Sequence, residues 1–67
     1  MKVLFNGKEI GEVVTNQSMT IEEALEFIGY NVYNQDDLQR AYNNDEPWAY
    51  INDDGKYHYD FESLELK

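Results

Sequence analysis

The sequence contains no cysteine, one histidine and one proline among its 67 residues. Without cysteine it can form neither a disulfide nor a thiolate zinc site, and His58 alone cannot supply the several imidazole ligands of a histidine-based metal site. We therefore predict no metal and no cofactor. A chain of this length buries only about 60% of the surface that it exposes when unfolded. Its stability must come from side-chain packing or from a partner chain.

Long apolar stretches are also missing. No segment approaches the roughly 20 consecutive apolar residues that a membrane-spanning helix requires. Asn6-Gly7-Lys8 interrupts the apolar start of the chain too early for the apolar region of a secretion signal. We therefore expect a soluble, cytoplasmic protein, and the lack of cysteine agrees with a reducing compartment.

Positive charge is scarce, because five Lys and Arg residues face 14 Asp and Glu residues, which gives a formal net charge of −9. Such a charge repels nucleic acids and anionic membranes and attracts basic protein surfaces. The composition therefore argues against direct binding of DNA, RNA or lipid. It favours a basic protein surface as the partner.

Groups that carry out catalysis are few. The hydroxyl nucleophiles are limited to two serines and two threonines, and the sequence has no G-x-S-x-G motif and no glycine-rich phosphate loop. His58 and Asp60 are two residues apart on a predicted strand and therefore lie on the same face. Two ligands do not make a metal site, and such polar pairs are typical of the solvated face of an antiparallel strand. We predict that the protein is not an enzyme and has no catalytic residue.

What the chain does contain is enough apolar surface to fold, with 42% hydrophobic residues that include six tyrosines, three phenylalanines and one tryptophan. Asn6-Gly7 between two apolar runs predicts an N-terminal hairpin with a tight turn. A two-residue loop would place Val3 opposite Ile10, and a three-residue loop would place Leu4 there. Gly11 indicates either a bulge or a close backbone approach.

A first helix is predicted after Thr20, because Thr20 and Glu23 have the spacing of a capping box. The apolar stripe that follows has helical spacing, and Gly29 stands where a C-terminal glycine is expected. The stripe consists of Ile21, Ala24, Leu25 and Ile28.

A second helix is predicted after Asn34 as the N-cap, with Asp36 and Asp37 in a first turn where the helix dipole favours negative charge. Its buried side would consist of Leu38, Ala41 and Tyr42, and it should end near Asn43-Asn44, before Pro47.

Residues 48–51 and 56–61 predict a second hairpin around Asp54-Gly55, with Trp48 opposite Phe61 and Tyr50 opposite Tyr59. The alternation of apolar residues then changes phase, so we expect a bulge or bend near Glu62-Ser63 and a short last strand at 63–66.

These elements predict one α+β domain over residues 1–67 in ββααββ order. The fold would be an antiparallel sheet of about four strands with both short helices packed on one face. Trp48 and Phe61 would fill the core, because so short a chain has few other large side chains to bury. Tyr30, Tyr33 and Tyr42 would be exposed and could contact a partner.

Acidic residues on or beside the two helices are the main predicted contacts with a partner. One interpretation is that these carboxylates only keep the protein soluble. A more specific interpretation is that they imitate the phosphates of DNA, which place one charge per about 1.7 Å of duplex axis. Convergence of the acidic clusters on one face does not follow from the sequence. The residues concerned are Glu22, Glu23, Glu26, Asp36, Asp37, Asp45 and Glu46.

In size, charge and richness in Asn and Tyr, the chain resembles small acidic proteins carried by phages and mobile elements, some of which mimic DNA to inhibit host nucleases or repair enzymes. This resemblance is compositional and rests on no motif. The leading hypothesis is therefore an acidic protein-binding module whose partner is a basic, nucleic-acid-binding protein. The alternative is a structural domain that self-associates as a homodimer, with its acidity serving solubility only.

Overall fold

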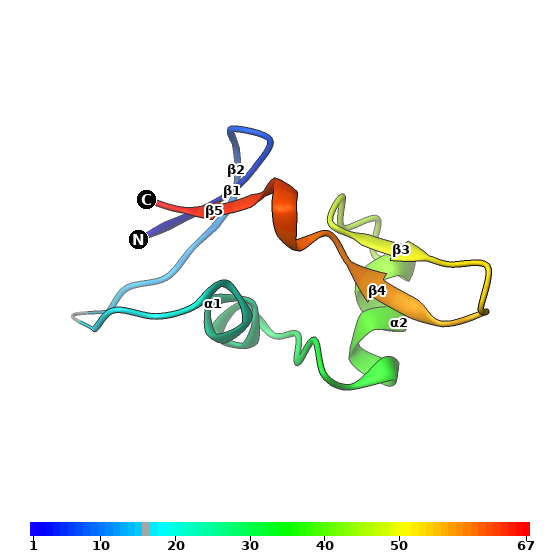
Figure 1. The fold of residues 1–67 in the computed structure, drawn as a ribbon. Helices are drawn as coiled ribbons and strands as arrows, with labels where there is room; N and C mark the ends of the chain where they lie inside the picture. Colours follow the sequence, from blue (N-terminus) through cyan, green and yellow to red (C-terminus); the bar gives the residue numbers. More distant parts are fainter. Residues whose placement is uncertain (16) are drawn as a thin grey trace.

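Residues 1–15 and 17–67, which the computed structural model describes, form two α-helices and five strands (Figure 1). The predicted α+β class and the ββααββ order are confirmed, and a short last strand follows the second hairpin as expected. The elements are β1 (Lys2–Phe5), β2 (Lys8–Glu12), α1 (Ile21–Ile28), α2 (Gln35–Asn43), β3 (Ala49–Ile51), β4 (Tyr57–Tyr59), a 3₁₀ turn η1 (Phe61–Ser63) and β5 (Leu64–Leu66).

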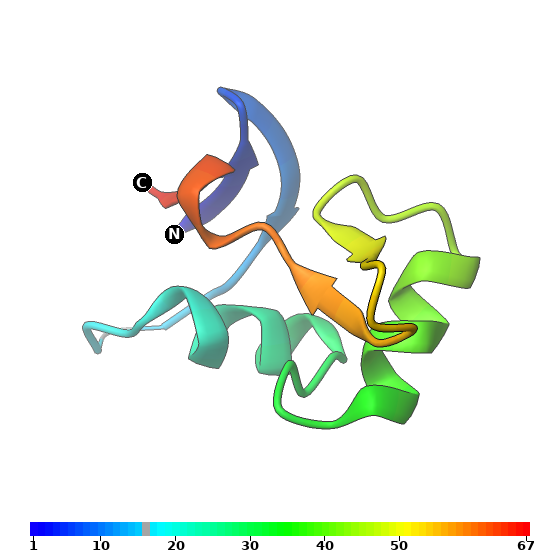
Figure 2. The ribbon, with the colours of Figure 1, turned by 45° about the vertical axis from the view of Figure 1, so that its right-hand side comes forward.

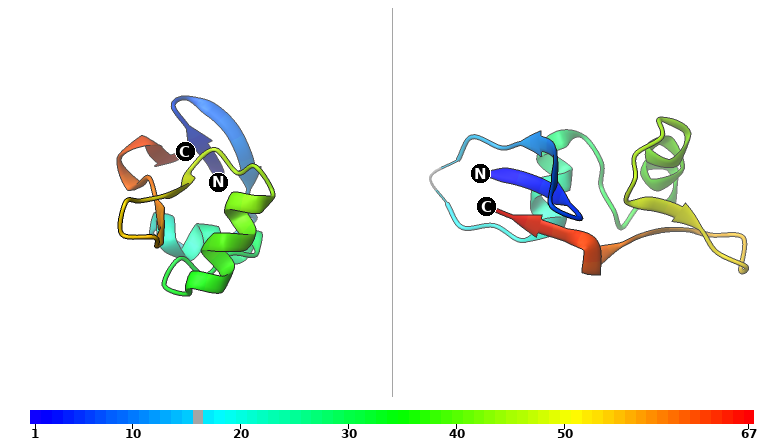
Figure 3. Two further views of the ribbon diagram at one scale, coloured as in Figure 1. Left: turned by 90° about the vertical axis from the view of Figure 1, so that its right-hand side faces the viewer. Right: turned by 90° about the horizontal axis from the view of Figure 1, so that it is seen from above.

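The strands form two antiparallel sheets, so the prediction of a single four-stranded sheet was wrong. One sheet has the order β2-β1-β5 and the other is the hairpin β3-β4. The predicted irregularity near Glu62-Ser63 is the 3₁₀ turn η1. It follows the hairpin and directs β5 towards the N-terminal strand β1. There β5 pairs with β1, and the N- and C-termini lie beside each other (Figures 1 and 3).

The first hairpin follows one register near its turn and another beyond it. Asn6 and Gly7 both have positive φ, as a type I′ turn requires. The two-residue loop pairs Phe5 with Lys8 and Leu4 with Glu9, and the register then shifts so that Val3 faces Gly11. Ile10 is the extra residue of a bulge at this shift, so neither register considered from the sequence holds along the whole hairpin.

Gly11 lies next to this bulge and also where helix α1 approaches the sheet closely. A Cβ atom on Gly11 would lie 2.7 Å from Cδ1 of Ile28. A glycine here therefore lets the helix lie close against β2, and both interpretations of Gly11 apply.

Helix α1 has the predicted signals at both ends. Thr20 and Glu23 form the capping box, with each side chain accepting from the other residue's backbone N–H. At the other end Gly29 has φ of 125°, and the N–H groups of Gly29 and Tyr30 donate to Glu26 and Leu25. This is a Schellman motif, in which the residue after the glycine packs back onto the helix.

Helix α2 begins as predicted, with the Asn34 side chain accepting from the Asp36 N–H at 2.8 Å. It packs on the β3-β4 hairpin, whereas α1 packs on the three-stranded sheet (Figure 2). Each helix therefore covers its own sheet, and the prediction of two helices on one face of a common sheet was wrong.

The second hairpin is shifted by one residue from the predicted register. Tyr50 faces His58 and Ala49 faces Tyr59. The loop contains three residues because Gly55, with φ of +78°, takes the left-handed position of a three-residue turn. Asp54 stabilises this turn by accepting the N–H of Lys56 at 2.9 Å.

The core has Trp48 at its centre, and the prediction for this residue is confirmed because only 1% of it is exposed. Phe61 was predicted beside it, but it lies in η1 and 56% of it is exposed. Within the described part of the chain, no helix has the length and apolar character needed to cross a membrane. The other buried residues are Val3, Val13, Ile21, Ala24, Leu25, Tyr30, Val32, Leu38, Ala41, Ala49 and Leu64.

Candidate functional site

Two of the predicted partner-binding carboxylates stabilise the helical segment itself. Glu23 closes the capping box of α1, accepting the Thr20 backbone N–H at 3.1 Å. Asp37 accepts the N–H of Asn31 at 2.8 Å and lies 3.5 Å from the Arg40 guanidinium. Both side chains already hold loops or helix ends in place, so they are poor candidates for a role in binding alone.

Two further predicted carboxylates accept hydrogen bonds from tyrosines. The Tyr30 hydroxyl donates to Glu46 at 3.4 Å, and the Tyr59 hydroxyl donates to Glu22 at 3.2 Å. Partial burial raises the pKa of Tyr59, and the neighbouring Glu22 carboxylate raises it further. Glu22 lies in α1 and Tyr59 in β4, so this contact links the first helix to the β3-β4 hairpin.

The remaining predicted carboxylates, Glu26, Asp36 and Asp45, are exposed, and their side chains make no hydrogen bond or ion pair with residues 1–15 or 17–67. Four carboxylates outside the predicted set also make no such contact, and three of them are exposed while Asp60 is half-buried. The spacing from Thr20 predicted a capping role for Glu23, but the sequence did not separate the other engaged carboxylates from the unengaged ones, because both use the same residue types. We call the seven the unengaged carboxylates: Glu12, Glu26, Asp36, Asp45, Asp53, Asp60 and Glu62.

The three tyrosines singled out in the sequence have different environments. Tyr33 is 81% exposed, and Tyr42 is 42% exposed with its ring 5.5 Å from that of Tyr57. Tyr30 was expected to be exposed but is only 7% exposed. Its position directly after Gly29 was the missed signal, because that position of a Schellman motif commonly makes an apolar contact with the helix.

Tyr30 instead joins the two helices to the core. Its ring meets Trp48 edge-on at 5.4 Å, and the Arg40 guanidinium lies 4.5 Å from the ring centroid. Asn44 donates to its hydroxyl at 3.1 Å, and Arg40 also donates to the Gly29 carbonyl. Tyr30 is therefore a structural residue, and its ring is too buried to contact a partner as predicted.

His58 pairs with Asp54 and not with Asp60. Its Nε2 lies 3.2 Å from Asp54 Oδ2, and its ring stacks on Tyr50 at 5.7 Å. The hydrogen bond from the Lys56 N–H is the main cause that lowers the pKa of Asp54, and the hydrogen bond and charge of His58 lower it further. Across the described ranges, no three His, Asp or Glu side chains lie close enough together to hold a metal ion.

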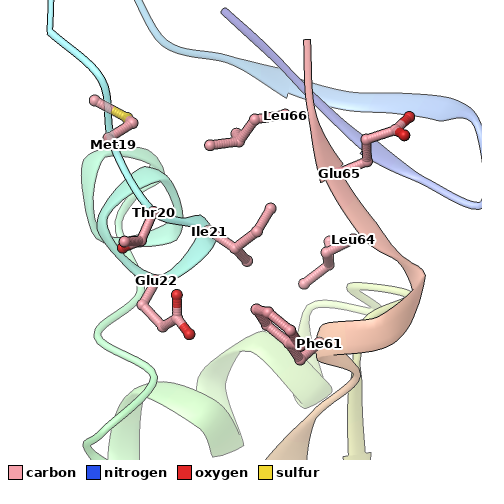
Figure 4. A pocket seen from close by; sticks show the side chains of 8 residues that line it. All are labelled: Met19, Thr20, Ile21, Glu22, Phe61, Leu64, Glu65 and Leu66. Atoms are coloured by element: carbon pink, nitrogen blue, oxygen red, sulfur yellow. The ribbon is translucent and has the colours of Figure 1, made fainter.

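Two open depressions lie beside α1. One of about 450 Å³ is bordered by Glu23, Glu26 and the exposed Phe27. The other, of about 430 Å³, lies between the start of α1 and strand β5 and is mostly apolar (Figure 4). We call the second one the β5 groove. It is lined by Met19, Thr20, Ile21, Glu22, Phe61, Leu64, Glu65 and Leu66.

No family model matches the chain, and no curated protein or solved structure matches it. The chemistry of its own surface must therefore indicate what it does.

Proposed function

We propose that the protein is a small acidic protein-binding module whose carboxylates contact a basic surface on a partner. The observation that supports this function is the set of unengaged carboxylates. Internal hydrogen bonds and ion pairs use the other acidic side chains, whereas these have no partner among the described residues, and all of them except the half-buried Asp60 are exposed. Surface charges of one sign steer and orient an oppositely charged partner.

Binding is favoured over catalysis because the titratable groups are not coupled into a site. The only histidine forms a surface pair with Asp54. Among the described residues, the Thr20 hydroxyl donates to the Glu23 carboxylate at 3.2 Å, but this pair belongs to the exposed capping box of α1 and has no third group to orient it. A cytoplasmic location fits the same composition. We propose binding as the activity and assign no catalytic residue.

The most specific form of this function is imitation of nucleic-acid charge. A partner that binds DNA or RNA presents Lys and Arg at the spacing of phosphates, and carboxylates on a small domain could occupy that surface. Duplex DNA would then compete with the protein for its partner. Competition therefore distinguishes mimicry from other acidic binding.

The test begins with capture of the tagged full chain's partners from lysate of its source, eluted in steps of rising salt. Salt screens exposed charge pairs over about 10 Å at 0.1 M ionic strength, so a partner held by many carboxylates leaves at high salt. The captured protein is then purified, and its Kd is measured with and without duplex DNA. Recovery of no partner, or release that does not depend on salt, would remove the proposal.

A charge-neutralising variant set identifies the carboxylates involved. Glu26→Gln, Asp36→Asn and Asp45→Asn together remove three charges near the helices. Amides suit this purpose because Asp45 has φ of 61°, a conformation that asparagine tolerates. We expect the Kd for the purified partner to rise about tenfold, since exposed charge pairs contribute about 0.2–1 kcal/mol each.

The matched control removes the same number of charges elsewhere, through Glu12→Gln, Asp53→Asn and Glu62→Gln. These carboxylates are equally unengaged, so the two triple variants differ in position and not in net charge. Equal loss of affinity in both would indicate a general charge effect. A loss confined to the first set would assign contact to the helical side.

A further inference from the structure

We propose that the partner contributes an extended, basic segment that adds to the outer edge of β5 as a fourth strand and lies in the β5 groove. The basic character of this segment rests on the function proposed above. The strand pairing rests on separate observations, namely the backbone groups of β5 and the side chains that line the groove.

The backbone of β5 has one edge satisfied and one edge open. Lys2 and Lys67 exchange two hydrogen bonds, of 2.6 and 2.9 Å, and the Asn6 N–H donates to Ser63. Because alternate residues of a strand direct their backbone groups to opposite sides, Leu64 and Leu66 face away from β1.

The outward-facing groups lack partners in the described part of the chain, with one exception. The Leu64 N–H donates to the Phe61 carbonyl. The Leu64 carbonyl and both backbone groups of Leu66 make no backbone hydrogen bond with any described residue. An incoming strand would satisfy them, which is the basis of recognition by strand addition.

The groove beside this edge has an apolar floor. Figure 4 shows Leu64 and Leu66 directed towards Ile21, with Met19 at one end and Phe61 at the other. Phe61 is one of the largest exposed apolar side chains, and it is not part of the core. Alternate apolar side chains of an added strand would cover it.

Charge at the rim determines what kind of segment fits. Two of the eight lining residues, Glu22 and Glu65, are acidic, and none is Lys or Arg. The Tyr59 hydroxyl holds the Glu22 carboxylate beside the groove, and Glu65 contacts Lys67 at 3.7 Å only as an exposed pair. A segment that alternates apolar residues with Lys or Arg therefore complements both the floor and the rim.

The outer edges of β4 and β2 are less suited to such pairing. The outward backbone groups of Tyr57 on β4 are met by the Gln35 side-chain amide, which donates to the carbonyl at 2.8 Å and accepts from the N–H at 2.9 Å. Strand β2 has the bulge at Ile10 and charged residues, both of which disfavour edge pairing. A second copy of the chain would bring another −9 charge to β5, so we commit to a basic partner segment.

The first experiment titrates the isotope-labelled full chain with a capped peptide of alternating Lys and Val and follows the backbone amide signals by NMR. The titration extends to about 1 mM peptide, so that a Kd of about 1 mM would still be detected. We expect the Leu64, Leu66 and Met19 signals to move, and that of Ile51 on β3 to stay. Peptide N-methylated at every backbone nitrogen keeps its charge but has no N–H to donate from either edge, and it should bind at least about tenfold more weakly. No shifts, shifts centred on Ile51, or equal binding of the methylated peptide would overturn the proposal.

The second experiment uses Phe61→Ser, with Tyr33→Ser as the control, because both side chains are exposed and neither belongs to the core. We expect Phe61→Ser to raise the peptide Kd about tenfold and Tyr33→Ser to leave it unchanged. Equal effects of the two changes would contradict the groove assignment. A doubled mass of the protein without peptide, abolished by Phe61→Ser, would instead indicate that a second copy occupies the edge.

The failure of this inference is distinguishable from failure of the proposed function. If the peptide does not bind but the helical triple variant still weakens capture of the partner, only the β5 groove is excluded. If the peptide binds at β5 but capture from lysate does not depend on charge, the acidic function falls while strand addition stands.

Discussion

The two halves of the molecule draw on different parts of the chain. The hairpin half, α2 with β3 and β4, comes from the continuous stretch of residues 35–59. The three-stranded half combines β1, β2 and α1 with β5 from the far end of the chain. Closing long loops before contacts form costs conformational entropy. Local neighbours therefore specify the hairpin half, whereas the three-stranded half depends on pairing between distant segments.

A few contacts make these halves one core. Tyr30 follows α1 and packs its ring on Trp48, which precedes β3. Glu22 of α1 accepts from Tyr59 of β4. We therefore expect changes at these contacts to affect both halves and changes elsewhere to remain within one half.

The largest effect is expected for Trp48→Ala, because Trp48 is fully buried where the halves meet. Truncation of a buried tryptophan costs about 3–5 kcal/mol, while a domain of this size has a total stability of about 3–10 kcal/mol. Urea unfolding followed by far-UV circular dichroism should show a single transition with a lowered free energy of unfolding, because both halves lose stability together. Tyr33→Ala should change the unfolding free energy by less than about 0.5 kcal/mol, and a similarly small loss at Trp48 would contradict a shared core.

Gly11→Ala should affect the three-stranded half. The new Cβ would overlap Cδ1 of Ile28, and overpacking costs about 1–3 kcal/mol. Ile28→Val removes that atom at a cost of about 0.5–1.5 kcal/mol. The double variant should therefore be more stable than the sum of the single losses implies, by about 1 kcal/mol in a denaturation cycle. Additive losses would show that the Ile28 side chain or helix α1 can move away from residue 11 without cost.

Gln35→Ala should act only in the hairpin half. It removes both hydrogen bonds to the exposed backbone of Tyr57, each worth about 0.5–1.5 kcal/mol at most when water can replace it. Hydrogen exchange at the Tyr57 amide should accelerate, while that of Val3 should change little. Gln39→Ala, an exposed change on the same helix, is the control, and equal acceleration in both variants would exclude a specific role for Gln35.

The smallest effect is expected at high pH, through the contact between Glu22 and Tyr59. Because folding raises the pKa of Tyr59, its contribution to stability is complete below the ordinary tyrosine value near 10 and is lost as pH rises through the folded pKa. Ultraviolet titration, with Tyr59→Phe as the reference, should detect this late ionisation. Glu22→Gln should reduce the shift without removing it, since burial is its larger cause. Complete loss of the shift would mean that the carboxylate is the main cause.

The pattern of residues was sufficient to predict the local elements. Both helix starts follow from a side chain and a backbone N–H two or three residues apart, as at Thr20 and Asn34. Turn positions also followed, because Asn6-Gly7 and Gly55 accept positive φ. The hairpin registers did not follow, because the bulge at Ile10 and the third residue of the second loop depend on what packs against each strand.

The candidate site shows the same division. The sequence identified acidic residues near the helices, and three of them, Glu26, Asp36 and Asp45, are available for a partner. It also predicted that Glu23 caps α1, which is confirmed. It could not show that Asp37 accepts the Asn31 N–H, because that contact joins the loop before α2 to the helix through folded geometry and not through a known spacing. The β5 groove was not predicted at all, since Ile21 and Phe61 come together only in the folded chain.

The sequence by itself determined the acidic surface, the two helices, the tight turns and the α+β class, because these depend on composition and on neighbours a few residues apart. Only the tertiary structure decided that there are two sheets, that Tyr30 is buried and Phe61 exposed, and which carboxylates remain unengaged. Those outcomes depend on which distant segments pair, and a pairing such as that of β5 with β1 is chosen by the packing of the whole chain.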